Sequence, residues 1–247
     1  MKRQEKIISL VSQETKIEVT RLAELLDVSN VTIRKDLDKL EEKGIIRRQH
    51  GFALLNNTDN LNFRLAINHD LKKRIARRAA ACINDGDTVM IESGSTCALL
   101  AEELAFNRKD ITIITNSVFI ATYIRKSATC KIILLGGEYQ PDSQCNIGPL
   151  VKKVVDEFYV DKLFIGVDGV DSARGFRCSD INRSDTTRTM ASAAKKVIVL
   201  TDSSKFEKNS IITEFQFSEV YQVFTDTDLP DETFKQLQAH HITVERV

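Results

Sequence analysis

The stretch Val28–Gly44, "VSNVTIRKDLDKLEEKG", predicts a helix with one buried face and one unusual outward face. Its apolar residues recur at i, i+4 and i+7, the spacing of a single helical stripe, at Ile33, Leu37 and Leu40. At about 100° per residue, Val31 and Lys35 then point almost directly away from that stripe. We expect Ser29 to be the N-cap of this helix and Gly44 to end it, because a left-handed residue costs glycine nothing.

The outward face carries an apolar side chain, a hydroxyl and cations, which suits a helix that reads DNA. Val31 and Thr32 can contact a thymine methyl group, and Arg34 or Lys35 can reach guanine or phosphate. The alternative is a solvated charged face, since four acids of the same helix dilute its positive charge, namely Asp36, Asp38, Glu41 and Glu42. We predict DNA binding through this helix and the basic segment that follows it. The predicted contact residues are Ser29, Val31, Thr32, Arg34, Lys35, Lys39, Arg47, Arg48 and His50.

The segments around this helix predict a small domain of three helices and a hairpin. The first helix, in "QEKIISLVSQE", has its apolar stripe at Ile7, Leu10 and Val11. In the second, we expect Thr20 as the N-cap and a buried face of Leu22, Leu25 and Leu26. Two short apolar runs around His50-Gly51 indicate a hairpin. This element order is that of a winged helix-turn-helix, which we place at residues 1–56.

The chain follows a different pattern beyond this domain. The polar, turn-rich "NNTDNLN" predicts a linker, which we place at residues 57–72. A helical stretch, "LKKRIARRAAACI", leads into apolar runs that alternate with helical patterns. These runs are "TVMIE", "ITIIT", "KIILLG", "DKLFIGV", "KVIVLT", "VYQVFT" and "ITVERV". The alternation predicts an α/β domain with a mainly parallel sheet at residues 73–247.

Composition limits the function classes. The chain has 247 residues with a formal net charge of zero, so any basic surface must be local. Its five cysteines form no CxxC pair, and with the four histidines they give no metal-ligand spacing, so we expect neither a metal site nor a cofactor. Without an apolar signal segment at Met1, the cysteines indicate reduced thiols and a cytoplasmic protein. No apolar run reaches the roughly 18 residues that a membrane span needs.

Small and hydroxyl residues follow several of the predicted strands. Because the carboxyl ends of parallel strands meet at one edge of a sheet, these residues predict a single ligand-binding crevice. The turn "SGST" would offer hydroxyls and backbone N–H groups to an anion at a helix N-terminus. The predicted effector-binding residues are Ser93, Gly94, Ser95, Thr96, Thr115, Asn116, Ser117, Gly136, Gly137, Asp168, Gly169, Asp202 and Lys205.

The whole chain resembles the DeoR family of bacterial sugar-operon repressors. "VSNVTIRKDLDKLEEKGIIRRQHG" is similar to that family's N-terminal signature, and "DGDTVMIESGST", "TNS", "LLGG", "DKLFIGVDGVD" and "TDSSKF" follow in its order. The closest likeness is to the glucitol and amino-sugar repressors. The resemblance implies a winged-helix domain joined to a sensor domain related to ribose-5-phosphate isomerase. Such sensors bind phosphorylated sugars, and the usual output is loss of DNA affinity.

The chain departs from the family pattern at several positions. Lys35 stands where the family often has a second arginine, and Gly51-Phe52 replaces the usual Gly-Gly after the wing histidine. The family tends to have threonine, asparagine and glutamate at the positions of Cys178, Asp180 and Arg183. A Glu-to-Arg reversal near the crevice would change the electrostatic surroundings of the ligand.

Three function classes therefore remain open on the sequence. The leading one is a ligand-responsive transcriptional repressor, an oligomer of at least two chains that binds an operator in double-stranded DNA and a phosphorylated sugar. The alternative is a sugar-phosphate isomerase-like enzyme with an added helical domain, for which Asp168 and Lys205 could supply an acid–base pair. In a third reading, the small domain docks onto proteins.

Overall fold

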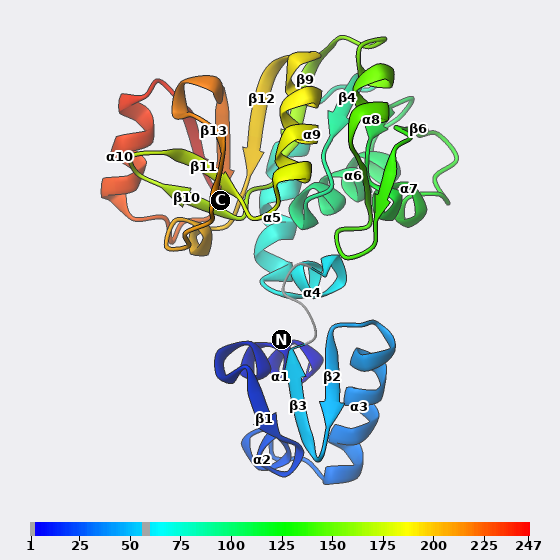
Figure 1. The fold of residues 1–247 in the computed structure, drawn as a ribbon, viewed down its shortest axis with the longest axis vertical. Coiled ribbons are helices and arrows are strands. Elements are labelled where there is room, and N and C mark those ends of the chain that lie inside the picture. Colours follow the sequence, from blue (N-terminus) through cyan, green and yellow to red (C-terminus); the bar gives the residue numbers. More distant parts are fainter. Residues whose placement is uncertain (1–2, 56–59) are drawn as a thin grey trace. The chain divides into compact units, whose positions relative to one another are not determined.

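The computed structural model describes residues 3–55 and 60–247, which fold into two compact units, Met1–His69 and Asp70–Val247 (Figure 1). Within the predicted linker at 57–72, residues 57–59 lie outside the described residues. The rest of that linker contains helix α4 (Leu61–Ala66) and the start of helix α5 (His69–Ala80). The division between the units therefore falls at the end of the predicted linker.

The first unit contains three helices and a three-stranded sheet before α4. The elements are α1 (Arg3–Glu14), β1 (Lys16–Glu18), α2 (Val19–Leu25), α3 (Asn30–Glu42), β2 (Ile46–Gln49) and β3 (Phe52–Leu55). The strands are antiparallel in the order β1-β3-β2, with β1 adding an edge to the β2–β3 hairpin. This arrangement confirms the predicted winged helix-turn-helix, although β1 was not predicted from the sequence.

The core of the first unit is built on the predicted stripes. Ile7 and Val11 of α1 pack with the three apolar residues of α3 and are fully buried. Two details of α2 were wrong: the helix begins at Val19 with Glu18 as its N-cap, so Thr20 lies inside the first turn. Leu25 is 43% exposed, because the helix ends there and its buried residues are Val19, Leu22 and Ala23.

Helix α4 belongs to the first unit because one of its apolar side chains packs into the core of that unit and one of its amides bonds to the end of α3. The side chain of Asn60 caps the helix by accepting hydrogen bonds from the backbone N–H groups of Asn62 and Phe63. Phe63 packs into the core of the first unit, and the Asn62 amide donates to the Lys43 carbonyl at 3.2 Å. The polar composition of the segment had indicated a linker, and these few contacts give it a helix instead.

The second unit is centred on a seven-stranded sheet in which every neighbouring pair is parallel. Its order is β15-β14-β12-β9-β4-β5-β6. The strands are β4 (Thr88–Ile91), β5 (Thr112–Thr115), β6 (Lys131–Leu134), β9 (Val160–Ile165), β12 (Ala194–Leu200), β14 (Gln222–Thr225) and β15 (Thr243–Arg246). These are the seven apolar runs of the sequence, so the α/β prediction is confirmed.

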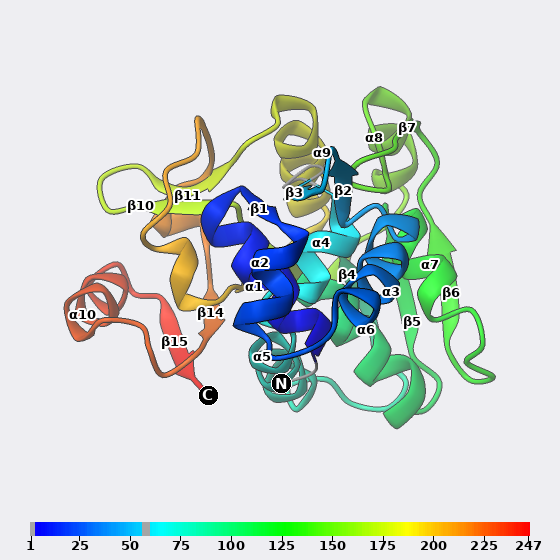
Figure 2. The same cartoon turned by 90° about the horizontal axis from the view of Figure 1, so that it is seen from below.

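Helices and small antiparallel sheets surround this parallel sheet (Figures 1 and 2). The remaining helices are α5, α6 (Ser95–Asn107), α7 (Val118–Tyr123), α8 (Pro149–Val155), α9 (Ile181–Ser192) and α10 (Asp231–Ala239), with short 3₁₀ turns η1 (Ser203–Lys205) and η2 (Phe217–Glu219). Strands β7 (Glu138–Gln140) and β8 (Cys145–Ile147) form a hairpin. Strands β10 (Gly169–Asp171), β11 (Gly175–Cys178) and β13 (Ile212–Phe215) form a separate sheet, on the same side of the unit as α10 in both views.

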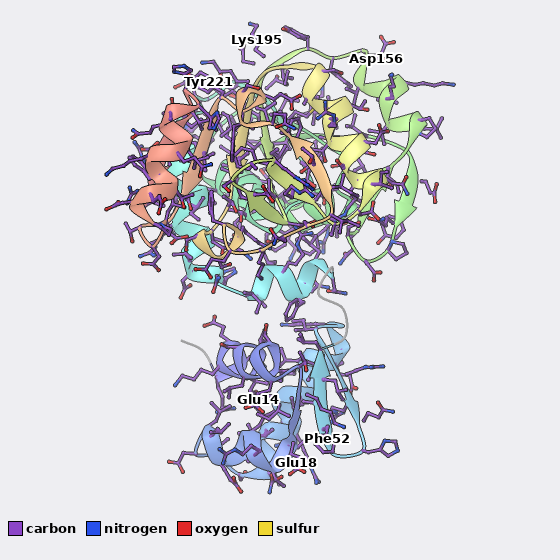
Figure 3. The ribbon with its side chains drawn as sticks, turned by 60° about the vertical axis from the view of Figure 1, so that its left-hand side comes forward. Glu14, Glu18, Phe52, Asp156, Lys195 and Tyr221 are labelled. Atoms are coloured by element: carbon purple, nitrogen blue, oxygen red, sulfur yellow. The ribbon has the colours of Figure 1, made fainter. Side chains whose placement is uncertain are left out.

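The parallel sheet gives the second unit two distinct edges. Asp156, Lys195 and Tyr221, labelled in Figure 3, lie close to the starts of β9, β12 and β14 and so mark the amino edge. The predicted effector residues follow the strands and lie at the opposite, carboxyl edge. None of the described helices is long and apolar enough to cross a membrane.

Candidate DNA-binding surface and effector site

The start of α3 is fixed by the predicted N-cap. The Ser29 hydroxyl accepts a hydrogen bond from the Thr32 backbone N–H at 3.2 Å, and the two side-chain hydroxyls lie 2.9 Å apart. Ser29 and Thr32 therefore shape the end of the helix that would meet DNA. Val31, between them, is 64% exposed.

The cations of α3 are exposed, and three of its four acids, Asp36, Asp38 and Glu41, are paired with arginines outside the helix. Arg34, Lys35 and Lys39 are exposed and make no ion pair within the described residues. Asp36 is buried and pairs with Arg3 of α1 at 2.5 Å, so it ties two helices together. The dilution of positive charge that the sequence suggested is thus smaller than a count of acids implies.

The wing ends in a two-residue turn. His50 and Gly51 both have positive φ, of 50° and 82°, and they join the paired residues Gln49 and Phe52. Such a turn matches the twist of a hairpin. Phe52, labelled in Figure 3, directly follows this turn.

A hollow of about 350 Å³ lies between the wing and α3. Its lining is Val19, Arg34, Glu41, Arg48, Gln49, His50 and Gly51. Arg47 and His50 are exposed on the wing. Arg48, a predicted DNA contact, is engaged with the acids of α3, since its guanidinium lies 2.6 Å from Asp38 and 2.8 Å from Glu41.

The loop between β4 and α6 carries a buried carboxylate that was not among the predicted site residues. Glu92 accepts hydrogen bonds from the Ser93 hydroxyl at 2.7 Å, the Gly94 N–H at 2.8 Å and the Gly166 N–H at 3.2 Å. The carboxylate thus bridges the loops after β4 and β9. It also occupies the first glycine amide that the sequence suggested for an anion.

Gly94 and Gly166 lie face to face beneath this bridge. A Cβ on Gly94 would be 3.1 Å from the Gly166 Cα, which is closer than ordinary van der Waals contact. Beyond Gly94, α6 begins with Ser95 and Thr96, both buried at 6% and 4% exposure. The predicted hydroxyls therefore stand at the N-terminus of a 13-residue helix.

The loops after β5 and β6 are joined through strand β8. Asn116 donates from its side chain to the Asn146 carbonyl at 3.0 Å, and Asn146 in turn donates to the Leu135 carbonyl at 2.8 Å. Thr115 and Ser117 are fully buried, and the Ser117 hydroxyl caps α7 by accepting from the Ile120 N–H. Gly136 and Gly137 follow Leu135, and Gly137 packs closely against β8.

Asp168, at the end of β9, is paired within the protein. One of its oxygens, Oδ2, lies 2.9 Å from Arg183 Nη2 and accepts hydrogen bonds from both the N–H and the hydroxyl of Ser179. Arg183 is 6% exposed, and its guanidinium also donates to the Ser179 hydroxyl at 2.8 Å. Asp180 caps α9 by accepting from the Arg183 N–H. Arg183 and Asp180 thus form one network with Asp168.

Further ionisable groups lie around this network. Burial, and then the carboxylates of Glu92 and Asp168, raise the pKa of the fully buried Glu214 well above its ordinary value. Burial likewise raises the pKa of the thiols of Cys145 and Cys178. The two thiols therefore stay protonated at neutral pH.

The remaining predicted site residues lie beside β12 and β10. Gly169 packs against the backbone at Lys208, where a side chain would meet the Lys208 carbonyl. Asp202 is buried and accepts a hydrogen bond from the Ser204 hydroxyl, and Lys205 ends the 3₁₀ turn η1 in a partly buried position. No group of three or more potential metal ligands occurs among residues 3–55 and 60–247.

Glu92 is absent from the predicted site residues because it is the last residue of the predicted strand "TVMIE". A carboxylate between "TVMI" and a glycine turn is costly to bury without partners, and that cost was the available signal. No comparable signal existed for Ser179, whose partners come from β9 and α9. For Arg183, the sequence indicates only a reversal of charge, not its partner Asp168.

Comparison with known proteins gives two family matches that cover most of the chain. Residues 3–59 match the DeoR-like helix-turn-helix domain, and residues 67–227 match the DeoR C terminal sensor domain. The chain is 34% identical to the transcriptional repressor AccR of Agrobacterium fabrum, over 91% of this chain and 89% of that protein. It is 32% identical to the glycerol-3-phosphate regulon repressor of Escherichia coli (97% and 96% covered) and 31% identical to the L-fucose operon activator of Haemophilus influenzae (97% of each).

Among solved structures, ribose 5-phosphate isomerase A of Methanocaldococcus jannaschii matches 56% of this chain and 55% of its own, with 22% identity and a TM-score of 0.41.

Proposed function

Because the chain belongs to the DeoR family of transcriptional regulators, we propose that it represses a carbohydrate-utilisation operon and leaves its operator when a phosphorylated sugar binds the second unit. As a member of this family it is a DNA-binding regulator and not an enzyme. Two of the three relatives above are named repressors and the third is named an activator, so the names favour the repressor role.

The observation that carries the effector proposal is the buried hydroxyl pair at the start of α6. Ser95 and Thr96 lie at the N-terminus of a long helix, where backbone N–H groups and the helix dipole favour an anion. A sugar phosphate carries about −1.5 to −2 charges at pH 7. Lys205 lies beyond the carboxyl end of β12, which is separated from β4 by β9, and would add a positive charge at the same edge of the sheet. We therefore propose that the phosphate binds at this end of the site.

The sugar end of the ligand would lie toward Asp168. A carboxylate repels phosphate but accepts hydrogen bonds from sugar hydroxyls, which supports this polarity. Because Asp168 is paired with Arg183 and Ser179, a sugar hydroxyl would have to share or replace these donors. The hydroxyl and amide groups of Thr115, Asn116 and Ser117, with the backbone at Gly136 and Gly137, form the proposed far wall.

A thermal-shift screen of the full chain against free sugars and their phosphates tests this proposal. We expect a phosphorylated sugar to raise Tm and the matching free sugar to have little effect. A charge-assisted hydrogen bond contributes roughly 1.5–3 kcal/mol, or about tenfold or more in affinity. Free sugars that bind as tightly as their phosphates would contradict the assignment. The glucitol and amino-sugar phosphates are the first candidates, because of the subgroup likeness in the sequence.

We propose that α3 reads the operator and that the wing meets the neighbouring phosphates. The exposed positions of Val31, Arg34, Lys35 and Lys39 support this use of the helix, and those of Arg47 and His50 support the use of the wing. One such module buries only about 600–1,000 Å² on DNA. We therefore propose at least a dimer on a symmetric site, which sedimentation at micromolar protein would test.

A further inference from the structure

Arg48 joins the wing to α3 through several hydrogen bonds. Its backbone N–H donates to Glu41 Oε1 at 2.8 Å, and its side-chain Nε donates to Glu41 Oε2 at 2.8 Å. Its Nη2 lies 2.8 Å from the same oxygen and 2.6 Å from Asp38 Oδ1. Asp38 and Glu41 are three residues apart, so they lie on one side of the last turns of α3.

These contacts hold both the main chain and the side chain of one wing residue. Charge-assisted hydrogen bonds from two guanidinium nitrogens to two carboxylates, together with one from the backbone N–H, fix relative orientation as well as distance. The hydrogen bond from the Arg48 backbone lowers the pKa of Glu41, and the contact with Glu41 raises the pKa of Arg48. Both groups therefore stay ionised across the neutral range.

The neighbouring residues of the same types are placed differently. Arg47 is exposed on the adjacent wing position, and Glu42 is exposed beside Glu41; within the described part of the chain neither makes an ion pair. They provide natural controls. The hollow lined by Arg34, Glu41, Arg48 and His50 lies between the two surfaces that Arg48 joins.

We infer that Arg48 is a positioning residue, which sets the angle of the wing against α3 through Glu41 and Asp38 and does not itself bind DNA. This inference rests on the proposed use of α3 and the wing on the operator. Ion pairs with this much exposure contribute little to stability. The expected consequence of losing the contact is therefore a misplaced wing on a domain that stays folded.

The direction in which one substitution changes operator affinity separates this positioning role from a purely electrostatic effect. Removing a carboxylate beside a DNA-binding surface ordinarily strengthens binding to the polyanion. If Glu41 holds Arg48 in place, Glu41→Gln should instead weaken operator binding, by about fivefold or more. Glu42→Gln, one residue away, should leave affinity unchanged or raise it slightly. An equal gain for both variants would overturn the inference.

The salt dependence of binding provides the second readout. The full-length protein and its variants would be titrated onto fluorescent operator DNA at several salt concentrations. Arg47→Ala should lower the slope of log affinity against log salt by about 0.9, the loss of one phosphate contact. Arg48→Ala should weaken binding with an unchanged slope. Arg48→Lys should restore only part of the affinity, because an ammonium lacks the planar set of N–H donors that contacts Glu41 and Asp38 together.

Two further results of the titrations would overturn the inference about Arg48. A slope that falls equally in Arg48→Ala and Arg47→Ala would make Arg48 a phosphate contact and overturn the inference. So would operator affinity that is unchanged in Arg48→Ala. A wild-type chain whose operator binding is insensitive to Lys35→Ala would overturn the proposed interface itself, which separates that failure from the failure of the Arg48 inference. Thermal unfolding of each variant confirms that the first unit remains folded.

Discussion

The outward face of α3 holds its cations in water, whereas the carboxyl edge of the parallel sheet holds its charges against other groups of the same chain. Arg34 and Lys35 are exposed and in no ion pair among the described residues. At the sheet edge, Asp168 is paired with Arg183, and Glu92 is bridged to two glycine amides. The DNA-binding face therefore offers charges that have no ion-pair partner to lose within the described part of the chain, whereas the charges of the sheet edge already have partners there.

The difference predicts two kinds of binding. When exposed cations of the protein neutralise DNA phosphates, the counterions bound to the DNA are released. Operator affinity should therefore depend steeply on salt concentration. A ligand at the sheet edge must exchange partners with Asp168, Arg183 or Ser179. An exchange of buried partners can favour one arrangement of the chain over another, and release from DNA requires such a differential effect.

Breaking the internal ion pair should have the largest effect. Asp168→Asn leaves the Arg183 guanidinium buried without its carboxylate, and removing one partner of a buried pair costs about 3–5 kcal/mol. At about 2–4 °C per kcal/mol for a chain of this size, Tm should fall by roughly 6–20 °C. Lys35→Ala, at an exposed cation, should change Tm little. Equal changes in Tm for the two variants in thermal unfolding would contradict the view that the sheet-edge charge is paired within the protein and the α3 charge is not.

The second effect concerns release from the operator. Thr96→Ala and Lys205→Ala should each weaken effector binding by roughly 1.5–3 kcal/mol, about tenfold or more. Both variants should bind operator normally but no longer leave it at an effector concentration that releases the wild type. Lys195→Ala, at the amino edge, is the matched control and should behave as wild type. The anisotropy of labelled operator DNA, followed as effector is added, measures release by all three variants. Normal release by both site variants would show that the phosphate does not bind at Thr96 and Lys205.

The third effect tests the exposed cations directly. Lys35→Ala should weaken operator binding by about 1–3 kcal/mol if the side chain contacts a base, and less on random DNA. The sensor unit should still bind its effector, because the substitution lies on α3. Affinities for operator and for random duplex, measured side by side, check this. Undiminished operator affinity would contradict the use of α3.

The smallest effect concerns the buried carboxyl of Glu214. The pKa of Glu214 is raised in the folded state, so between its ordinary value of 4.5 and the folded value the folded chain binds more protons than the unfolded one. Stability should therefore fall as pH rises through the folded pKa. Glu214→Gln should reduce that fall and raise stability at neutral pH by roughly 1 kcal/mol. Urea unfolding at several pH values measures it, and an unchanged pH profile would show that another group dominates.

Much of the fold follows from apolar periodicity. All seven strands of the parallel sheet are runs of apolar residues, and the buried stripe of α3 repeats at helical spacing. Strands β1, β7, β8, β10, β11 and β13 escaped prediction because each has only three or four residues and none contains a continuous apolar run. Leu25 was misplaced for a related reason, since its helix ends there.

The site residues divide in the same way. Residue types at strand ends indicated the loops that lie at the carboxyl edge, including Ser95 and Thr96. Pairings between distant residues were invisible, because Arg183 meets Asp168 across 15 positions and Arg48 meets Glu41 across seven. A sequence shows which groups are charged, and the fold determines which of these charges are already neutralised.

The close approach of Gly94 and Gly166 has a practical consequence for anyone who would turn this chain into a biosensor. A Cβ at Gly94 or Gly166 would lie 3.1 Å or 3.3 Å from the opposite Cα, so the backbone there would have to shift. Glu92 joins both loops, and the three positions therefore form a part of the scaffold that a library should leave untouched. Variation aimed at new inducers belongs at positions of the carboxyl edge that carry neither this bridge nor the Asp168–Arg183 ion pair.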